Sequence, residues 1–182
     1  AIYFGNGDVP YATVQRFAAD APDFAKGGVF RTRLEQALTK QNADGATVIA
    51  SLGGSMPNTI DGQIALAAAY RADGQTDRAA RIARTIWVDN FLEREQEDRV
   101  LAQLGDLLDA QSHWARAEHL MMNDRAAGVE RLMPFMTPAQ RSLAVARNAT
   151  SRNDKDAKKL LDSVDPSMTS NPVFQFSRAQ RA

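Results

Sequence analysis

Several residue types and sequence features are scarce or absent in this chain. Its 182 residues include no cysteine, which excludes disulfide bonds, thiolate catalysis and cysteine-based zinc sites. Lysine plus arginine equals aspartate plus glutamate at 22 each, so no strong basic field attracts nucleic acid or an anionic membrane. No apolar run has the length of a membrane span, and no signal-peptide core is present.

The residues that are present form helical patterns, most clearly in Ile64–Trp87. Asp73-Gly74 divides this stretch, because glycine accepts the left-handed conformation common at helix ends. We expect Thr76 or Asp77 to cap the second helix. The apolar residues of that helix recur at spacings of three and four: Ala79, Ile82, Ala83, Ile86 and Trp87. A hairpin of this kind is the unit of helical-repeat proteins.

Further start signals predict helices along the rest of the chain. Thr137-Pro138 with Gln140 is the clearest, combining a cap, a proline at the first position and a capping-box glutamine. Asn90 with Glu93 also has capping-box spacing, and Ser112 is expected to cap the helix through Asn123. No segment alternates with a period of two, so no sheet is expected. We predict an all-α fold of about ten helices, an α-solenoid of antiparallel hairpins forming one domain over residues 1–182.

Histidine occurs only twice, and neither the histidines, the carboxylates nor the glycine-rich segments stand in a specific catalytic motif. His113 and His119 are six apart, on different faces of a helix, so they do not chelate one metal ion. Two carboxylate pairs have helical spacing, Glu93 with Glu97 and Asp106 with Asp109, but both lie in mixed-charge runs typical of solvated faces. The glycine-rich segments Gly5-Asn6-Gly7 and Gly53-Gly54-Ser55 lack the lysine of a P-loop and predict turns. We therefore assign no catalytic, cofactor-binding or metal-binding residue.

Two further groups of residues are compatible with binding. Four methionines lie around Phe135 and suit either core packing or an adaptable binding surface: Met121, Met122, Met133 and Met136. Arginines recur at helical spacings and are a hypothetical lining of a groove for an anionic polymer: Arg78, Arg81, Arg84, Arg141, Arg147 and Arg152.

The order and spacing of several short motifs resemble the superhelical domain of bacterial soluble lytic murein transglycosylases of alphaproteobacterial type. The matching positions run from Phe30 to the end of the chain: Phe30-Arg31, Arg33, Glu35, Leu66–Ala83, Ile86-Trp87, Phe91, Glu95, Leu104-Gly105, Leu107-Leu108, His113, Arg116, Leu143-Ala144, Ala146-Arg147, Leu160-Leu161, Val164, Asn171-Pro172, Phe174, Arg178 and Arg181.

The resemblance implies a non-catalytic helical scaffold in the periplasm. In that family a separate lysozyme-like domain carries the catalytic glutamate, and its Glu-Ser motif has no counterpart here. We therefore expect this chain to be inactive alone and to be part of a longer protein, because it ends within a helical pattern at Phe174–Ala182. The implied partners are peptidoglycan glycan strands, the protein's own catalytic domain or another protein, without nucleic acid, a membrane span or a cofactor.

A stand-alone adaptor of tetratricopeptide type is the alternative interpretation. The arrangement of Tyr70, Gly74 and Ala79 fits the crossing of that repeat, and such an adaptor binds protein. The absence of a regular period near 34 residues argues against it. An enzyme with a site of its own is the third interpretation and has the least support from the motifs.

Overall fold

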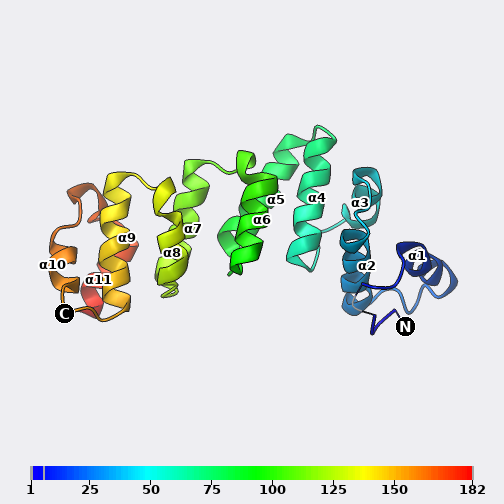
Figure 1. The fold of residues 1–182 in the computed structure, drawn as a ribbon, viewed down its shortest axis with the longest axis horizontal. Coiled ribbons are helices and arrows are strands. Elements are labelled where there is room, and N and C mark those ends of the chain that lie inside the picture. Colours follow the sequence, from blue (N-terminus) through cyan, green and yellow to red (C-terminus); the bar gives the residue numbers. More distant parts are fainter. Residues whose placement is uncertain (1, 6, 182) are drawn as a thin grey trace. The chain divides into compact units, whose positions relative to one another are not determined.

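The computed structural model describes residues 2–5 and 7–181, and within them the fold is all-α, as predicted. These residues form eleven α-helices and three short 3₁₀ helices, with no strand among them (Figure 1). Asn6, in the middle of the first glycine-rich segment, lies outside the described residues. Among the described helices, none combines the length and apolar character needed to cross a bilayer.

The contacts divide the chain into two compact units, each described separately. The first contains the residues up to Ile86 together with Leu92–Leu107, and the second contains Trp87–Phe91 and the residues from Leu108 onward. Helix α5 (Thr76–Asp89) contributes residues to both units.

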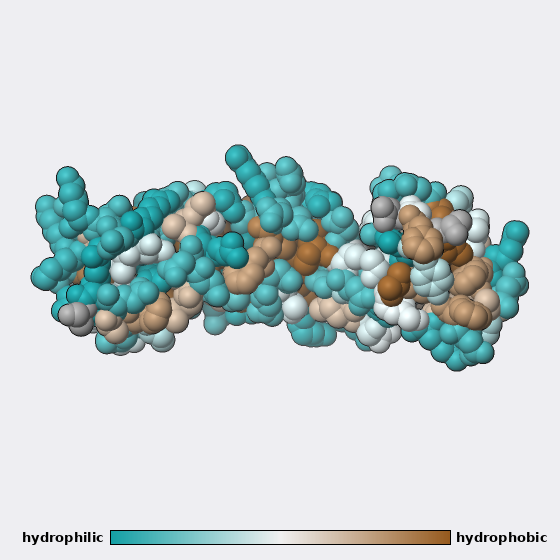
Figure 2. Space-filling model, turned by 90° about the horizontal axis from the view of Figure 1, so that it is seen from below, coloured by the Kyte–Doolittle hydropathy of each residue, from teal (hydrophilic) through white to brown (hydrophobic). Residues whose placement is uncertain are grey.

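The first unit is built around α4. Its elements are α1 (Tyr11–Asp20), α2 (Gly28–Lys40), α3 (Gly45–Leu52), α4 (Ile60–Ala72), the residues of α5 up to Ile86, α6 (Arg94–Leu104) and η1 (Gly105–Leu107). Helix α4 packs on α2, α3 and α6. The core between α2, α3, α4 and α5 consists of Leu38, Val48, Leu52, Leu66, Ala69, Tyr70 and Ala79. Much of the molecular face in Figure 2 is hydrophilic, and hydrophobic side chains gather over the N-terminal elements of this unit, where Phe24 is 69% exposed.

The second unit is built around α9. Its elements are α7 (Ala110–Met122), α8 (Ala126–Leu132), η2 (Met133–Phe135), α9 (Pro138–Ser151), α10 (Ala157–Asp162), η3 (Pro166–Met168) and α11 (Pro172–Gln180). Helix α9 packs on α7, α8, α10 and α11. Within both units, most helix contacts join neighbours that lie one or two helices apart in the chain, as in helical-repeat proteins, and in the second unit α11 also contacts α7.

One turn geometry recurs in four helical hairpins. The hairpins are α2–α3, α4–α5, α7–α8 and α9–α10, and the residue with a left-handed backbone is Asn42, Gly74, Asp124 and Asn153 respectively. In each turn the following N–H donates to the carbonyl five residues earlier, from Ala43 to Leu38 and from Gln75 to Tyr70, for example. This pair of features defines a Schellman ending of the first helix. The hairpin predicted at Gly74 is thus confirmed, and three further hairpins share its turn.

The predicted helix caps were partly wrong. Thr137 and Gln140 form the expected capping box of α9. Helix α6, however, is capped by Glu93 with Gln96, not by Asn90 with Glu93, because the chain enters the helix only at Arg94.

Two other predicted starts lie too late in the sequence. Asp109 caps α7, accepting hydrogen bonds from the backbone N–H of Ser112 at 2.7 Å and from its hydroxyl at 2.6 Å, so Ser112 is inside the helix. Helix α5 already begins at Thr76, and the carbonyl of Gln75 accepts the first helical hydrogen bond from Ala79. In α7 the Asp109 carboxylate satisfies the N–H of Ser112, one of the first-turn groups that have no partner within the helix.

Candidate functional site

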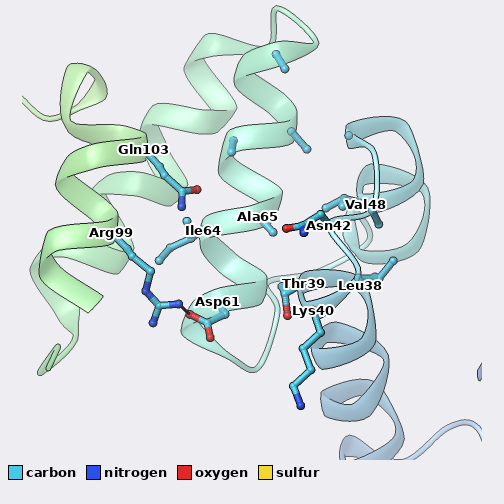
Figure 3. A pocket seen from close by; sticks show the side chains of 15 residues that line it. Leu38, Thr39, Lys40, Asn42, Val48, Asp61, Ile64, Ala65, Arg99 and Gln103 are labelled. Carbon is cyan, nitrogen blue, oxygen red and sulfur yellow. Dashed lines mark ion pairs between the residues drawn. The ribbon is translucent and has the colours of Figure 1, made fainter. Parts of the chain in front are cut away.

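The main candidate site is a groove of about 600 Å³ in the first unit, lined by α2, α3, α4 and α6 (Figure 3). Its floor is one face of α4, where small residues recur at helical spacings: Ala65, Ala68, Ala69 and Ala72. Alanine methyl groups leave open the space that larger side chains would fill. The floor is therefore shallow, apolar and continuous along the helix.

Two carboxamides reach into this groove from different elements. Asn42 lies in the Schellman turn after α2 with a φ of 49°, and asparagine is one of the few residues that tolerate this conformation. Gln103 lies near the end of α6. Figure 3 shows the two side chains approaching the groove from opposite sides, with Ala65 between them. Both residues are exposed, and neither carboxamide has a hydrogen-bond partner within the described part of the chain.

An ion pair closes one end of the groove. Arg99 of α6 lies 2.8 Å from the Asp61 carboxylate of α4, and both side chains are about half exposed. An exposed pair of this kind contributes roughly 0–1 kcal/mol, so it orients the two side chains more than it stabilises the unit. Lys40, on the opposite wall, pairs with Asp8 at 2.6 Å near the surface.

Most of the residues that line the groove are apolar, and two of them carry a carboxamide. Asp61 is the one carboxylate among the described residues that line it, and no histidine or serine lines it. Hydrolysis or transfer at a glycosidic bond ordinarily uses a pair of carboxylates. Two exposed carboxamides over an apolar floor suit a ligand that carries amide groups, since each carboxamide offers a donor and an acceptor.

The histidines considered from the sequence are structural residues of the second unit. His113 is buried, stacked on Phe135 at 4.0 Å between ring centroids and packed edge-on against Trp87 at 5.6 Å. Burial lowers the pKa of His113, and the nearby Asp109 carboxylate opposes that shift. His119 packs on Phe91, with ring centroids 4.9 Å apart. Within the described residues, no group of three potential metal ligands lies together.

The carboxylate pairs also have local structural roles. Glu93 and Asp109 cap helices, as described above. Asp106 accepts a hydrogen bond from Arg71 at 2.6 Å. Glu97 is buried on α6. The structure thus brings no two of these carboxylates together in a cleft.

The methionine cluster is divided between core and surface. Met121 and Met136 are buried, whereas Met122 and Phe135 are about 40% exposed (43% and 42%). The packing interpretation therefore holds for the first two.

The hypothesis that the arginines share one basic groove is wrong for Arg147. Its side chain is fully buried and donates to the carbonyl of Met121 at 2.9 Å and to Asp124 at 2.5 Å. Arg141 donates to the backbone carbonyls of Met133, the first residue of η2, and of Met136, which follows it. Arg152 pairs with Glu130 at 2.7 Å.

Sequence reasoning did not identify three buried charges as structural contacts, although they are among the positions that carry the family resemblance. The Glu35 carboxylate accepts hydrogen bonds from the backbone N–H groups of Asn58 and Thr59 at 2.8 and 2.7 Å, and so holds the start of α4. Arg116 donates to the carbonyls of Trp87 and Asn90 at 2.5 and 3.0 Å. The third charge is Arg147. In the sequence, the one feature that could have indicated these buried contacts is the position of a charged residue within the apolar stripe of a helix.

Comparison with protein-family models, with curated protein sequences and with solved structures gave no match.

Proposed function

We propose that this chain is a non-catalytic helical scaffold of a periplasmic peptidoglycan lytic transglycosylase, and that its groove holds a glycan strand. The carrying observation is the pair of carboxamides, Asn42 and Gln103, over the alanine floor. Peptidoglycan strands carry an acetamido group on each sugar. The methyl of that group would pack on the alanine floor, and its N–H and C=O would pair with the carboxamides.

The family resemblance is a second line of support. Several positions that carry it, including Glu35, Trp87, Arg116 and Arg147, are buried residues that join one helix to another. Residues with such a role are expected to keep their order and spacing wherever the same helical arrangement is used, because a helix-to-helix contact fixes both partners. The catalytic step is assigned to a different part of the parent protein.

Co-sedimentation with purified insoluble murein tests the proposal. We expect saturable binding, weakened about five-fold by Gln103→Ala and by Asn42→Gly, since one neutral hydrogen bond is worth about 1 kcal/mol. Glycine accepts the left-handed backbone at position 42, so Asn42→Gly removes the carboxamide without straining the turn.

The second unit supplies a matched control for this experiment. Asn153 occupies the same kind of turn, with a φ of 56°, and is not part of the groove. Asn153→Gly should therefore leave murein binding unchanged. Equal binding by all variants would refute the groove as the glycan site. A cleared band in zymography with this chain alone would refute the assignment of the catalytic step to another domain.

A protein-binding adaptor of tetratricopeptide type is the second candidate function. The recurrence of one Schellman turn in four hairpins favours it, because that repeat also joins its paired helices by a short turn. The turn residues are spaced 32 apart between Asn42 and Gly74 but 50 apart between Gly74 and Asp124, so the repeat is irregular. Tight binding of a protein partner in the same groove, with no binding to murein, would favour the adaptor.

A further inference from the structure

A second cavity of the first unit, with a volume of about 340 Å³, lies against a different face of α4. Leu66 and Tyr70 of α4 contribute to its lining, together with Ile82 of α5. On α4, Leu66 and Tyr70 are rotated by about 100° or more around the helix axis from Ala65 and Ala68 of the glycan groove, given 100° per residue. The two cavities share no lining residue.

The wall opposite α5 is a loop held in place by several hydrogen bonds. The Arg31 guanidinium donates to the carbonyls of Ser55 and Met56, at 2.9 and 3.4 Å. The hydroxyl of Tyr70 donates to the carbonyl of Gly53 at 3.3 Å. The loop continues into the segment that Glu35 binds, so it is anchored at both sides of Met56.

Met56 gives this anchored loop an apolar contact surface. Its side chain is 43% exposed although it lines a cavity whose floor is Leu66 and Ile82. A wall that is already ordered loses little conformational freedom on binding, which favours affinity. Methionine adds adaptable apolar contact.

The rim of the cavity is positively charged. Arg78 lies over the ring of Tyr70, 5.2 Å from its centroid, and donates to Gln75 at 3.1 Å. Arg81, one turn further along α5, is exposed and has no hydrogen bond or ion pair within the described residues. No acidic residue is among the described residues that line the cavity.

We infer that this cavity is a docking site for a partner polypeptide segment in which an apolar side chain is followed by carboxylates. The apolar side chain would enter between Met56 and Ile82, and the carboxylates would pair with Arg81 and Arg78. The volume is suited to one or two side chains, since pockets for drug-sized ligands start at about 300 Å³. The apolar floor disfavours a bare phosphate, which keeps its hydration or takes polar partners.

Fluorescence anisotropy with the full 182-residue chain tests this site. The probe is a fluorescein-labelled nonapeptide of glycine and serine that contains one leucine followed by two glutamates. The reference peptide carries glutamine in place of both glutamates. We expect saturable binding of the probe, at least five-fold weaker binding of the reference peptide, and a loss of about five-fold in affinity for Arg81→Gln. Met56→Ala should weaken binding by a similar factor through lost apolar contact.

Two control variants separate this site from general charge effects and from the glycan groove. Arg94→Gln removes the same charge from an exposed position outside the cavity and should leave binding unchanged. Gln103→Ala, which tests the glycan groove, should also leave peptide binding unchanged, so the failure of one proposal does not imply failure of the other. Absence of saturable peptide binding would overturn the inference. Equal affinity of wild type and Arg81→Gln, or binding of anionic lipid vesicles in preference to the peptide, would overturn it as well.

Discussion

In the first unit a buried carboxylate holds the start of a helix, whereas in the second unit buried guanidinium groups hold the ends of helices. Glu35 of α2 accepts from the N–H groups that precede α4. Arg116 of α7 donates to carbonyls at the end of α5, and Arg147 of α9 donates to the last turn of α7. The charge is opposite in sign because a helix presents free N–H groups at its start and free carbonyl groups at its end.

The buried carboxylate of the first unit and the buried guanidinium groups of the second unit also differ in the side chains that surround them. Gly62 of α4 makes room for Glu35: a Cβ atom at this position would lie 3.1 Å from the Glu35 carboxylate and 2.9 Å from the Thr59 hydroxyl. Each buried arginine is instead covered by an aromatic ring. The Arg116 guanidinium lies 4.5 Å from the centroid of Trp87, and that of Arg147 lies 4.9 Å from the centroid of Phe176. In this chain the buried carboxylate thus lies beside a glycine, and each buried guanidinium lies over the face of an aromatic ring.

The largest expected effect is the loss of Arg147. Arg147→Ala removes the hydrogen bonds to Met121, Asp124 and Gln180 and leaves a void under Phe176, so we expect the free energy of unfolding to fall by about 3–5 kcal/mol. Urea unfolding followed by circular dichroism measures it. Arg147→Met fills much of the void and should recover part of the loss. If Arg147→Ala lowered the free energy of unfolding by less than about 1 kcal/mol, Arg147 would not be a main stabilising contact of the second unit.

The corresponding change in the first unit should have a smaller effect. Glu35→Gln keeps one acceptor oxygen but places an amide NH₂ against backbone donors, and we expect a loss of about 2 kcal/mol. The same urea measurement applies, with Gln36→Glu on the same helix as an isosteric control. A loss equal to that of Arg147→Ala would show that the sign of the buried charge does not distinguish the two units.

The second unit should also respond to pH through His113. Because burial lowers the pKa of His113 in the folded state, the unfolded chain, with a pKa near 6.5, binds protons more readily. The stability contributed by neutral His113 is therefore complete above pH 6.5 and is lost as the pH falls from there towards the lower folded pKa. Between pH 7.5 and 5, Tm should fall more for the wild type than for His113→Gln. Equal pH dependence of Tm in the wild type and in His113→Gln would contradict this assignment.

The smallest effect is expected at the groove of the first unit. Arg99→Gln breaks the half-exposed pair with Asp61, and the free energy of unfolding should change by no more than about 1 kcal/mol. Added salt should reduce this difference further, because it screens an exposed ion pair. If Arg99→Gln lowered the free energy of unfolding by several kcal/mol, the groove wall would be part of the core of the first unit and not an exposed binding surface.

Helix positions followed from the sequence wherever a local signal was unambiguous. Thr137-Pro138 with Gln140 marked the start of α9, and Gly74 marked the turn between α4 and α5. Where two residues could cap the same helix, the choice failed, as for Ser112 and Asp109. A cap depends on where the incoming chain turns, and that direction is set by packing.

The sequence by itself determined the all-α class and the hairpin with its turn at Gly74, because these depend on apolar periodicity and on turn residues. Only the tertiary structure decided which residues meet. Asn42 and Gln103 are far apart in the chain and lie on opposite sides of one groove because α4 packs on both α2 and α6. In the same way, only packing showed that Glu35 and Arg147 are buried partners of backbone groups, since the N–H and carbonyl groups that they bind lie 23 to 26 residues away in the chain.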